Sequence, residues 1–136
     1  MPVLSRRGAV AVALAALAVP VTAALGQRAG AADQRFPDVV AVKVRAGAGG
    51  TFDFDATVSS PYDTPQRYAD AFRVAGKNGQ VYGERVLLHD HAGEQPFTRD
   101  LYGVVIPVGI RVVVVQARDR KNGYGGKSVE VALPGR

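Results

Sequence analysis

Residues 51–58 read Thr-Phe-Asp-Phe-Asp-Ala-Thr-Val, and their strict alternation decides the fold class. Phe52, Phe54, Ala56 and Val58 fall on one face of an extended chain, while the polar residues fall on the other. A period of two is typical of a β-strand with one buried and one solvated face. No stretch beyond the N-terminal region shows a helical period of useful length, so we expect an all-β protein.

Six other strand-like runs flank this stretch, with turn residues between them. Asn78-Gly79, which separates two of the runs, is a strong hairpin signal. Residues 112–115 are all valine, as expected for a central strand covered on both faces. Runs spaced by about a dozen residues predict a seven-stranded antiparallel β-sandwich. The expected strands cover residues 40–45, 51–58, 68–75, 81–88, 97–106, 110–117 and 128–133.

The last third of the chain carries a resemblance at the level of the fold. Residues 106–109, 117–119 and 123–126 look like the closing strands of a fibronectin type III or immunoglobulin-like domain. The resemblance implies such a sandwich for residues 39–136. It implies no function, because many functions share this fold.

The N-terminus has the pattern of an export signal. Arg6 and Arg7 form a basic start, residues 9–25 are an uncharged Ala/Val/Leu run, and Ala29 to Ala31 offer a small-residue cleavage site. The arginine pair and the mild hydrophobicity favour the twin-arginine route, and the Sec route stays open.

We therefore predict a signal peptide at residues 1–31, a short lead at 32–38 and the sandwich domain at 39–136. Pro20 interrupts the apolar run, whose length is at the lower limit for a membrane span, so a lasting anchor is disfavoured. The expected location is periplasmic, cell-envelope or extracellular, with no stable membrane span after processing.

Composition excludes several classes of function. The chain has no cysteine, which rules out disulfides, thiolate metal sites, a lipoprotein anchor and a cysteine nucleophile. Removing the signal lowers the net charge from +5 to +2, because Arg6, Arg7 and Arg28 leave with it. The remaining charges of both signs are interleaved, which gives no electrostatic case for binding nucleic acid.

Residues 88–99 hold both histidines of the chain. If this region is a strand, His89 and His91 project to the same face, and Glu94 can return from the turn as a third ligand. Two imidazoles and a carboxylate suit a divalent transition metal such as Cu, Zn or Ni. One hypothesis is therefore a metal site made of His89, His91 and Glu94.

The alternative hypothesis is a structural network or a binding surface. Arg99 can pair with Glu94, while Gln95 and Thr98 can satisfy the backbone where Pro96 interrupts the strand. The predicted loop at residues 119–126 supplies further members of this surface. They are Asp119, Asn122 and Tyr124.

Three motifs also resemble a group of small secreted bacterial proteins of no assigned function. They are Tyr68-Ala69-Asp70, the run His89-x-His91-x-x-Glu94-Gln95-Pro96-Phe97-Thr98-Arg99, and Gly123-Tyr124-Gly125-Gly126. The resemblance implies an exported sandwich domain and no particular chemistry. In this group a histidine often precedes the Gly-Tyr-Gly-Gly run, and Asn122 stands in that place here.

Nucleophilic catalysis lacks a motif, because no serine has the neighbours that would activate it. We therefore favour a non-enzymatic binding or interaction module whose partner is an unidentified protein or small ligand. The alternative function is a metal-binding or carrier protein that uses the His-x-His-x-x-Glu residues, with a divalent transition metal as its cofactor.

Overall fold

The structure is a computed structural model that describes residues 33–136. The predicted signal peptide, residues 1–31, lies outside the described residues together with its marker positions Arg6, Arg7, Ala29 and Ala31. No helix within the described range has the length and hydropathy needed to cross a membrane.

Seven strands and one short 3-10 turn make up the described chain. Their bounds are β1 Asp38–Ala46, η1 Ala48–Gly50, β2 Thr51–Ser59, β3 Ala69–Ala75, β4 Val81–Val86, β5 Phe97–Val105, β6 Val112–Asp119 and β7 Gly123–Ala132. The predicted hairpin at Asn78-Gly79 is confirmed, because β3 and β4 pair on either side of it.

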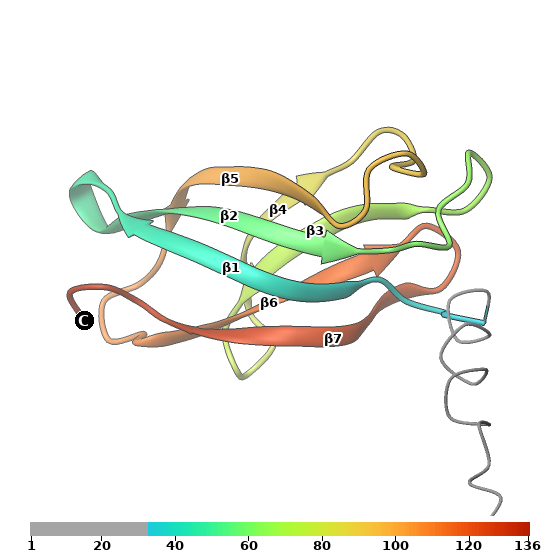
Figure 1. The fold of residues 1–136 in the computed structure, drawn as a ribbon. Coiled ribbons are helices and arrows are strands. Elements are labelled where there is room, and N and C mark those ends of the chain that lie inside the picture. Colours follow the sequence, from blue (N-terminus) through green and yellow to red (C-terminus); the bar gives the residue numbers. More distant parts are fainter. Residues whose placement is uncertain (1–32) are drawn as a thin grey trace, which may run out of the picture.

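The strands form two layers that face each other (Figure 1). One sheet has the order β1-β2-β5 and the other the order β4-β3-β6-β7, with antiparallel pairing throughout. The predicted all-β, seven-stranded antiparallel sandwich is confirmed. The division into three and four strands fits the immunoglobulin and fibronectin type III-like arrangement that the sequence resembled.

The inward faces of both sheets share one apolar core. Phe54, Phe72 and Phe97 come from β2, β3 and β5, and all three side chains are fully buried. The predicted buried face of residues 51–58 is confirmed, since none of its four apolar side chains is more than 3% exposed. β6 is a central strand, as predicted, with β3 and β7 on either side. Its valines alternate between buried and half-buried, so its outer face is only partly covered and not fully covered as expected.

A β-bulge changes the predicted alternation in β1. The pairing with β2 shifts register between Val39 and Ala41. Val39 is buried and Val40 is half exposed, whereas Val42 and Val44 pack against the core. Because a bulge adds one residue to one strand, Val40 does not share a face with the next two valines.

Several predicted strand bounds differ from the structure by two residues or more, and two of these differences affect the candidate site. β4 ends at Val86, so His89 and His91 lie in a loop and not on a strand. β7 begins at Gly123 instead of near residue 128, because residues 123–125 pair with the end of β6. In both cases the pairing with the neighbouring strand decides where the ladder ends, and the apolar pattern of a single strand does not contain that information.

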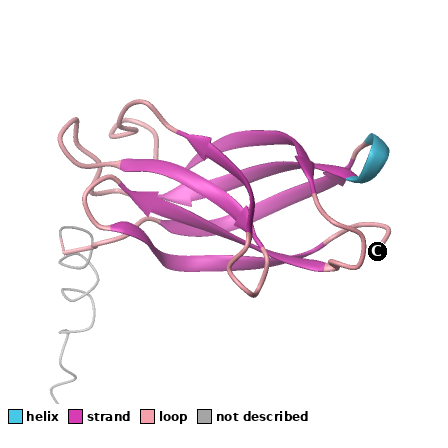
Figure 2. Cartoon of the chain, turned by 180° about the vertical axis from the view of Figure 1, so that it is seen from behind, coloured by secondary structure: helices cyan, strands magenta, loops and turns pink. Residues whose placement is uncertain are grey.

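The connections lie toward the two ends of the strands; in Figure 2 most pink loops gather at the left and right, and one hangs below the middle. One end, called the loop end below, contains residues 60–68, 87–96 and 120–122, next to the lead residues 33–37 (Figure 1). The opposite end contains the turns around residues 47–50, 76–80 and 106–111.

The lead crosses β7 in close contact with two glycines. A methyl group at Gly126 would lie 2.2 Å from the carbonyl oxygen of Pro37, and one at Gly125 would lie 2.4 Å from the ring of Phe36. The backbone N–H of Lys127 also donates to the Asp38 carboxylate at 2.8 Å. Glycine at these two positions allows the lead to pack on the sheet.

Gly126→Ala should therefore destabilise the protein more than Gly109→Ala. Both glycines have positive φ, which costs an alanine about 1–2 kcal/mol. Only Gly126 lacks room for the added methyl, whereas Gly109 has no atom within 4 Å. Urea unfolding of the two variants measures the difference, and equal losses would show that the lead is not packed as described.

Candidate functional site

Buried polar side chains in residues 33–136 occur only at the loop end. They are Ser60, Asp63, His91 and Asp119. Ser60 and Asp63 belong to the β2–β3 connection, His91 to the β4–β5 connection, and Asp119 ends β6. A buried polar group is tolerated when it is hydrogen-bonded, so these four residues indicate where the connections are held together.

The carboxylate of Asp119 is the centre of the first group of contacts. It is 0% exposed and accepts hydrogen bonds from the Tyr62 hydroxyl at 2.7 Å and from the backbone N–H groups of Lys121 and Asn122 at 3.0 and 2.8 Å. Nε of Arg67 lies 3.1 Å from the same carboxylate, and its guanidinium covers the Tyr62 ring at 4.0 Å. These contacts join the β6–β7 turn to the β2–β3 connection.

Asp63 joins the β2–β3 and β4–β5 connections. Its Oδ1 accepts the backbone N–H of Ala69 and its Oδ2 accepts that of His91, both at 3.1 Å. Nδ1 of His91 lies 3.6 Å from the same Oδ2. Both side chains are buried, so little solvent screens the carboxylate from the imidazole.

The side chain of Gln95 makes a second link between these two connections. Its Oε1 accepts the backbone N–H of Ser60 at 2.7 Å, while its Nε2 donates to the Ser60 hydroxyl at 3.2 Å and to the carbonyl of His91 at 3.1 Å. Gln95 thereby satisfies the backbone N–H of Ser60 and the backbone carbonyl of His91.

The two histidines lie side by side within the loop. The His91 ring stacks on Phe97, with centroids 3.8 Å apart, and the His89 ring lies 5.2 Å from it. Both rings line a cavity of about 160 Å³ together with Arg85, Arg99 and residues 86–88. Burial and the nearby charge of Arg99 hold the pKa of His91 below its ordinary value.

Glu94 is directed to Arg99 and not to the histidines. Nη1 and Nη2 of Arg99 donate to its two carboxylate oxygens at 3.2 and 3.0 Å, a bidentate pair on the surface. Hydrogen bonding to Arg99 lowers the pKa of Glu94. No three His, Asp or Glu side chains of residues 33–136 form a group that could hold a metal ion. The three-residue metal site stays a prediction.

The remaining predicted residues are divided between the loop end and the outer faces of the sheets. Asn122 donates its side-chain amide to the carbonyl of Arg35 at 3.0 Å, which fixes the lead to the β6–β7 turn. The hydroxyl of Thr98 pairs with that of Thr57 at 2.7 Å, between β5 and β2. Tyr124 lies in β7, where the guanidinium of Arg73 covers its ring at 3.9 Å.

Sequence reasoning missed Tyr62, Asp63 and Arg67, which hold the loop end together. They belong to a polar, proline-flanked connection whose composition indicates a solvated loop. A signal does exist, because Tyr62-Asp63 places an aromatic hydroxyl and a carboxylate directly after a cleanly alternating strand. That signal does not separate a buried carboxylate from an exposed one.

A comparison with curated proteins finds a similar sequence. A protein of Halomicrobium mukohataei described as "Putative lipoprotein" is 35% identical over 99 residues. The aligned part is 73% of this chain and 48% of that protein, so the chain spans about half the length of the curated relative it matches. No family model matches the chain. No solved structure matches it.

Removing the buried carboxylate of Asp119 should destabilise the protein strongly. Asp119→Ala leaves Arg67, Tyr62 and two backbone N–H groups without their acceptor, which should cost about 3–5 kcal/mol of unfolding free energy. Asp100→Ala removes an exposed partner of Arg85 and should cost less than about 1 kcal/mol. Urea denaturation of both variants checks this, and similar losses would contradict it.

Tyr62 should make stability sensitive to alkaline pH. Burial and the hydrogen bond to Asp119 raise the pKa of Tyr62 above its ordinary value of 10.0. The phenol is therefore neutral in the folded protein at a pH where the unfolded chain ionises it. Its contribution is complete below about pH 9 and is lost as the pH rises above about 10.

Between about pH 10 and 11, the free energy of unfolding should fall by up to about 1.4 kcal/mol per pH unit more in the wild type than in Tyr62→Phe. Urea denaturation at several pH values gives both slopes. Parallel slopes would mean that Tyr62 titrates alike in the folded and unfolded chains.

Proposed function

We propose that the protein is an exported, non-enzymatic binding module of the cell envelope, and that its loop end contacts a protein partner. The Halomicrobium relative is named a lipoprotein, and lipid-anchored proteins are held at a membrane. That similarity supports a location at the cell envelope. The signal pattern of residues 1–31 supports export.

The observation that carries the proposal is the exposed, apolar Leu88 on a loop that is internally fixed. Leu88 is 83% exposed, while its neighbour Leu87 is buried in the core and His91, three residues later, is buried against Asp63. A side chain presented from a fixed loop loses little conformational freedom on binding. Loops at one end of an immunoglobulin-like sandwich are a common binding surface.

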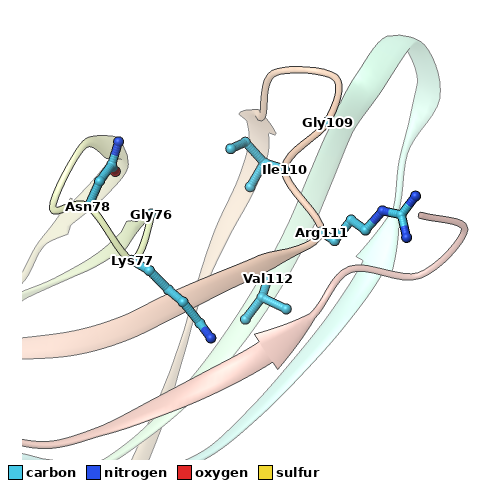
Figure 3. Close-up of a pocket in the computed structure, with 7 residues that line it drawn as sticks. All are labelled: Gly76, Lys77, Asn78, Gly109, Ile110, Arg111 and Val112. Carbon is cyan, nitrogen blue, oxygen red and sulfur yellow. The ribbon is translucent and has the colours of Figure 1, made fainter.

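The size of the cavities favours a protein partner over a small organic ligand. Drug-sized ligands occupy cavities of about 300–1,000 Å³, and the cavity at the loop end has about 160 Å³. A larger hollow of about 430 Å³ lies at the opposite end, between the β3–β4 hairpin and residues 109–112. Figure 3 shows that Lys77 and Arg111 diverge there, so these two charged groups do not converge on one ligand.

The chemistry of the loop end does not favour catalysis. The Ser60 hydroxyl is bound to the amide of Gln95, which is not a base that can activate it. The carboxylates of Asp63 and Asp119 are occupied by backbone and side-chain donors. These contacts stabilise the loop end and leave its exposed residues free for contact with a partner.

The proposal is tested by placing a charge at each end of the sandwich. Leu88→Asp should weaken binding of the purified protein to isolated cell envelopes of its own organism by at least about tenfold, as expected for a hot-spot residue. Val108→Asp is the matched control, because Val108 is 96% exposed and lies at the opposite end. Sedimentation of the protein with the envelopes measures both.

Both substitutions are on the surface, so both variants should melt like the wild type. Equal binding by the two variants, or a loss confined to Val108→Asp, would overturn the assignment of the loop end. Binding that survives protease treatment of the envelopes would replace the protein partner with a lipid or a polysaccharide.

A further inference from the structure

The hydrogen atom of the His89 ring can be assigned from its contact. Nδ1 lies 2.9 Å from the carbonyl oxygen of Asp90. A carbonyl oxygen only accepts hydrogen bonds, so Nδ1 carries the hydrogen and donates it. Nε2 of the neutral ring therefore has its lone pair free.

His91 is oriented in the same sense by a buried carboxylate. Its Nδ1 has no hydrogen-bond partner in the described chain, and Oδ2 of the Asp63 carboxylate lies 3.6 Å from it. A lone pair on Nδ1 would face a negative oxygen, so the hydrogen belongs on Nδ1 and the lone pair on Nε2. A carboxylate behind Nδ1 is the usual arrangement for a histidine that binds a metal through Nε2.

The spacing of the rings fits one shared ion. At a metal–nitrogen bond of about 2.0 Å, each ring centroid lies about 3 Å from the ion, so two rings at a tetrahedral angle have centroids about 5 Å apart. The observed separation is 5.2 Å, with the rings tilted by 40°. The cavity of about 160 Å³ that both rings line has room for an ion and several waters.

Ion pairs offset part of the positive charge around the cavity. Arg85 and Arg99 both line it, but each is paired with a carboxylate, Asp100 and Glu94 respectively. Glu94 is therefore committed to an ion pair, and Asp63 adds a negative charge behind His91. A cation between the two histidines does not face two free guanidinium groups.

We propose that Nε2 of His89 and Nε2 of His91 together bind one divalent ion of the copper, nickel and zinc group, most tightly Cu(II). The Asp90 carbonyl and the Asp63 carboxylate orient the two rings, and the other coordination positions are open to water. Imidazole suits all three metals, and Cu(II) stands highest in their general order of affinity. Glu94 is not a ligand of this site, in contrast to the three-residue hypothesis.

The test uses the full chain without a polyhistidine tag, titrated by calorimetry with Cu(II), Ni(II) or Zn(II) alone. The wild type should bind one ion, and the Cu(II) form should show nitrogen hyperfine coupling from two imidazoles in its electron paramagnetic resonance spectrum. His89→Ala should lose at least about tenfold in affinity and should fold normally, because His89 is exposed and its hydrogen bond to Asp90 lies at the surface.

Two variants separate the ligand sets. Glu94→Gln keeps the size of the side chain and should bind within about twofold of the wild type, whereas a Glu94 ligand would make it lose affinity as His89→Ala does. Val108→Ala, at the opposite end of the sandwich and 96% exposed, is the matched control and should bind as the wild type does.

The proposal is overturned if none of the three ions binds more tightly than about 100 μM, if His89→Ala binds like the wild type, or if Glu94→Gln loses as much as His89→Ala. It is independent of the proposed function. Envelope binding by metal-free His89→Ala tests the docking surface alone, and the titration tests the metal site alone.

Discussion

A fully buried carboxylate, that of Asp119, sets the constraint on which the loop end depends. A charge removed from water is tolerated only where donors surround it, and here the donors come from the β6–β7 turn and from Tyr62 and Arg67 of another connection. The positions of these donors depend on one another, because all of them must contact the two oxygens of one carboxylate. Asp63 repeats this arrangement between the β2–β3 and β4–β5 connections.

This arrangement divides the molecule into parts with different physical origins of stability. The interior between the sheets is apolar and is stabilised by burial of aromatic and branched side chains. The loop end is stabilised by hydrogen bonds to buried groups, which are directional and specify one geometry. Exposed residues of the β4–β5 connection, Leu88 and His89, are therefore presented from a backbone that the contacts of Asp63 and Gln95 hold in place.

Sequence reasoning succeeded where the relevant physics is local. The period of two in residues 51–58 directly indicates that one face is buried. Asn78-Gly79 indicates a turn, because these two residues themselves favour the backbone conformation of a hairpin turn. It failed where the register between paired strands decides the outcome. The bulge near Val40 and the end of β4 at Val86 both depend on the register with a partner, so a continuous local pattern gave no sign of them.

The amino-acid sequence by itself determined the class of fold, the number of strands and the clustering of both histidines in one short segment. Only the tertiary structure decided which carboxylates are buried. Asp55 and Asp119 both lie in strands beside apolar residues, yet Asp55 faces solvent-exposed Arg45 while Asp119 is enclosed. The difference arises because burial depends on which distant donors fold over an oxygen, and those donors are brought there by other strands.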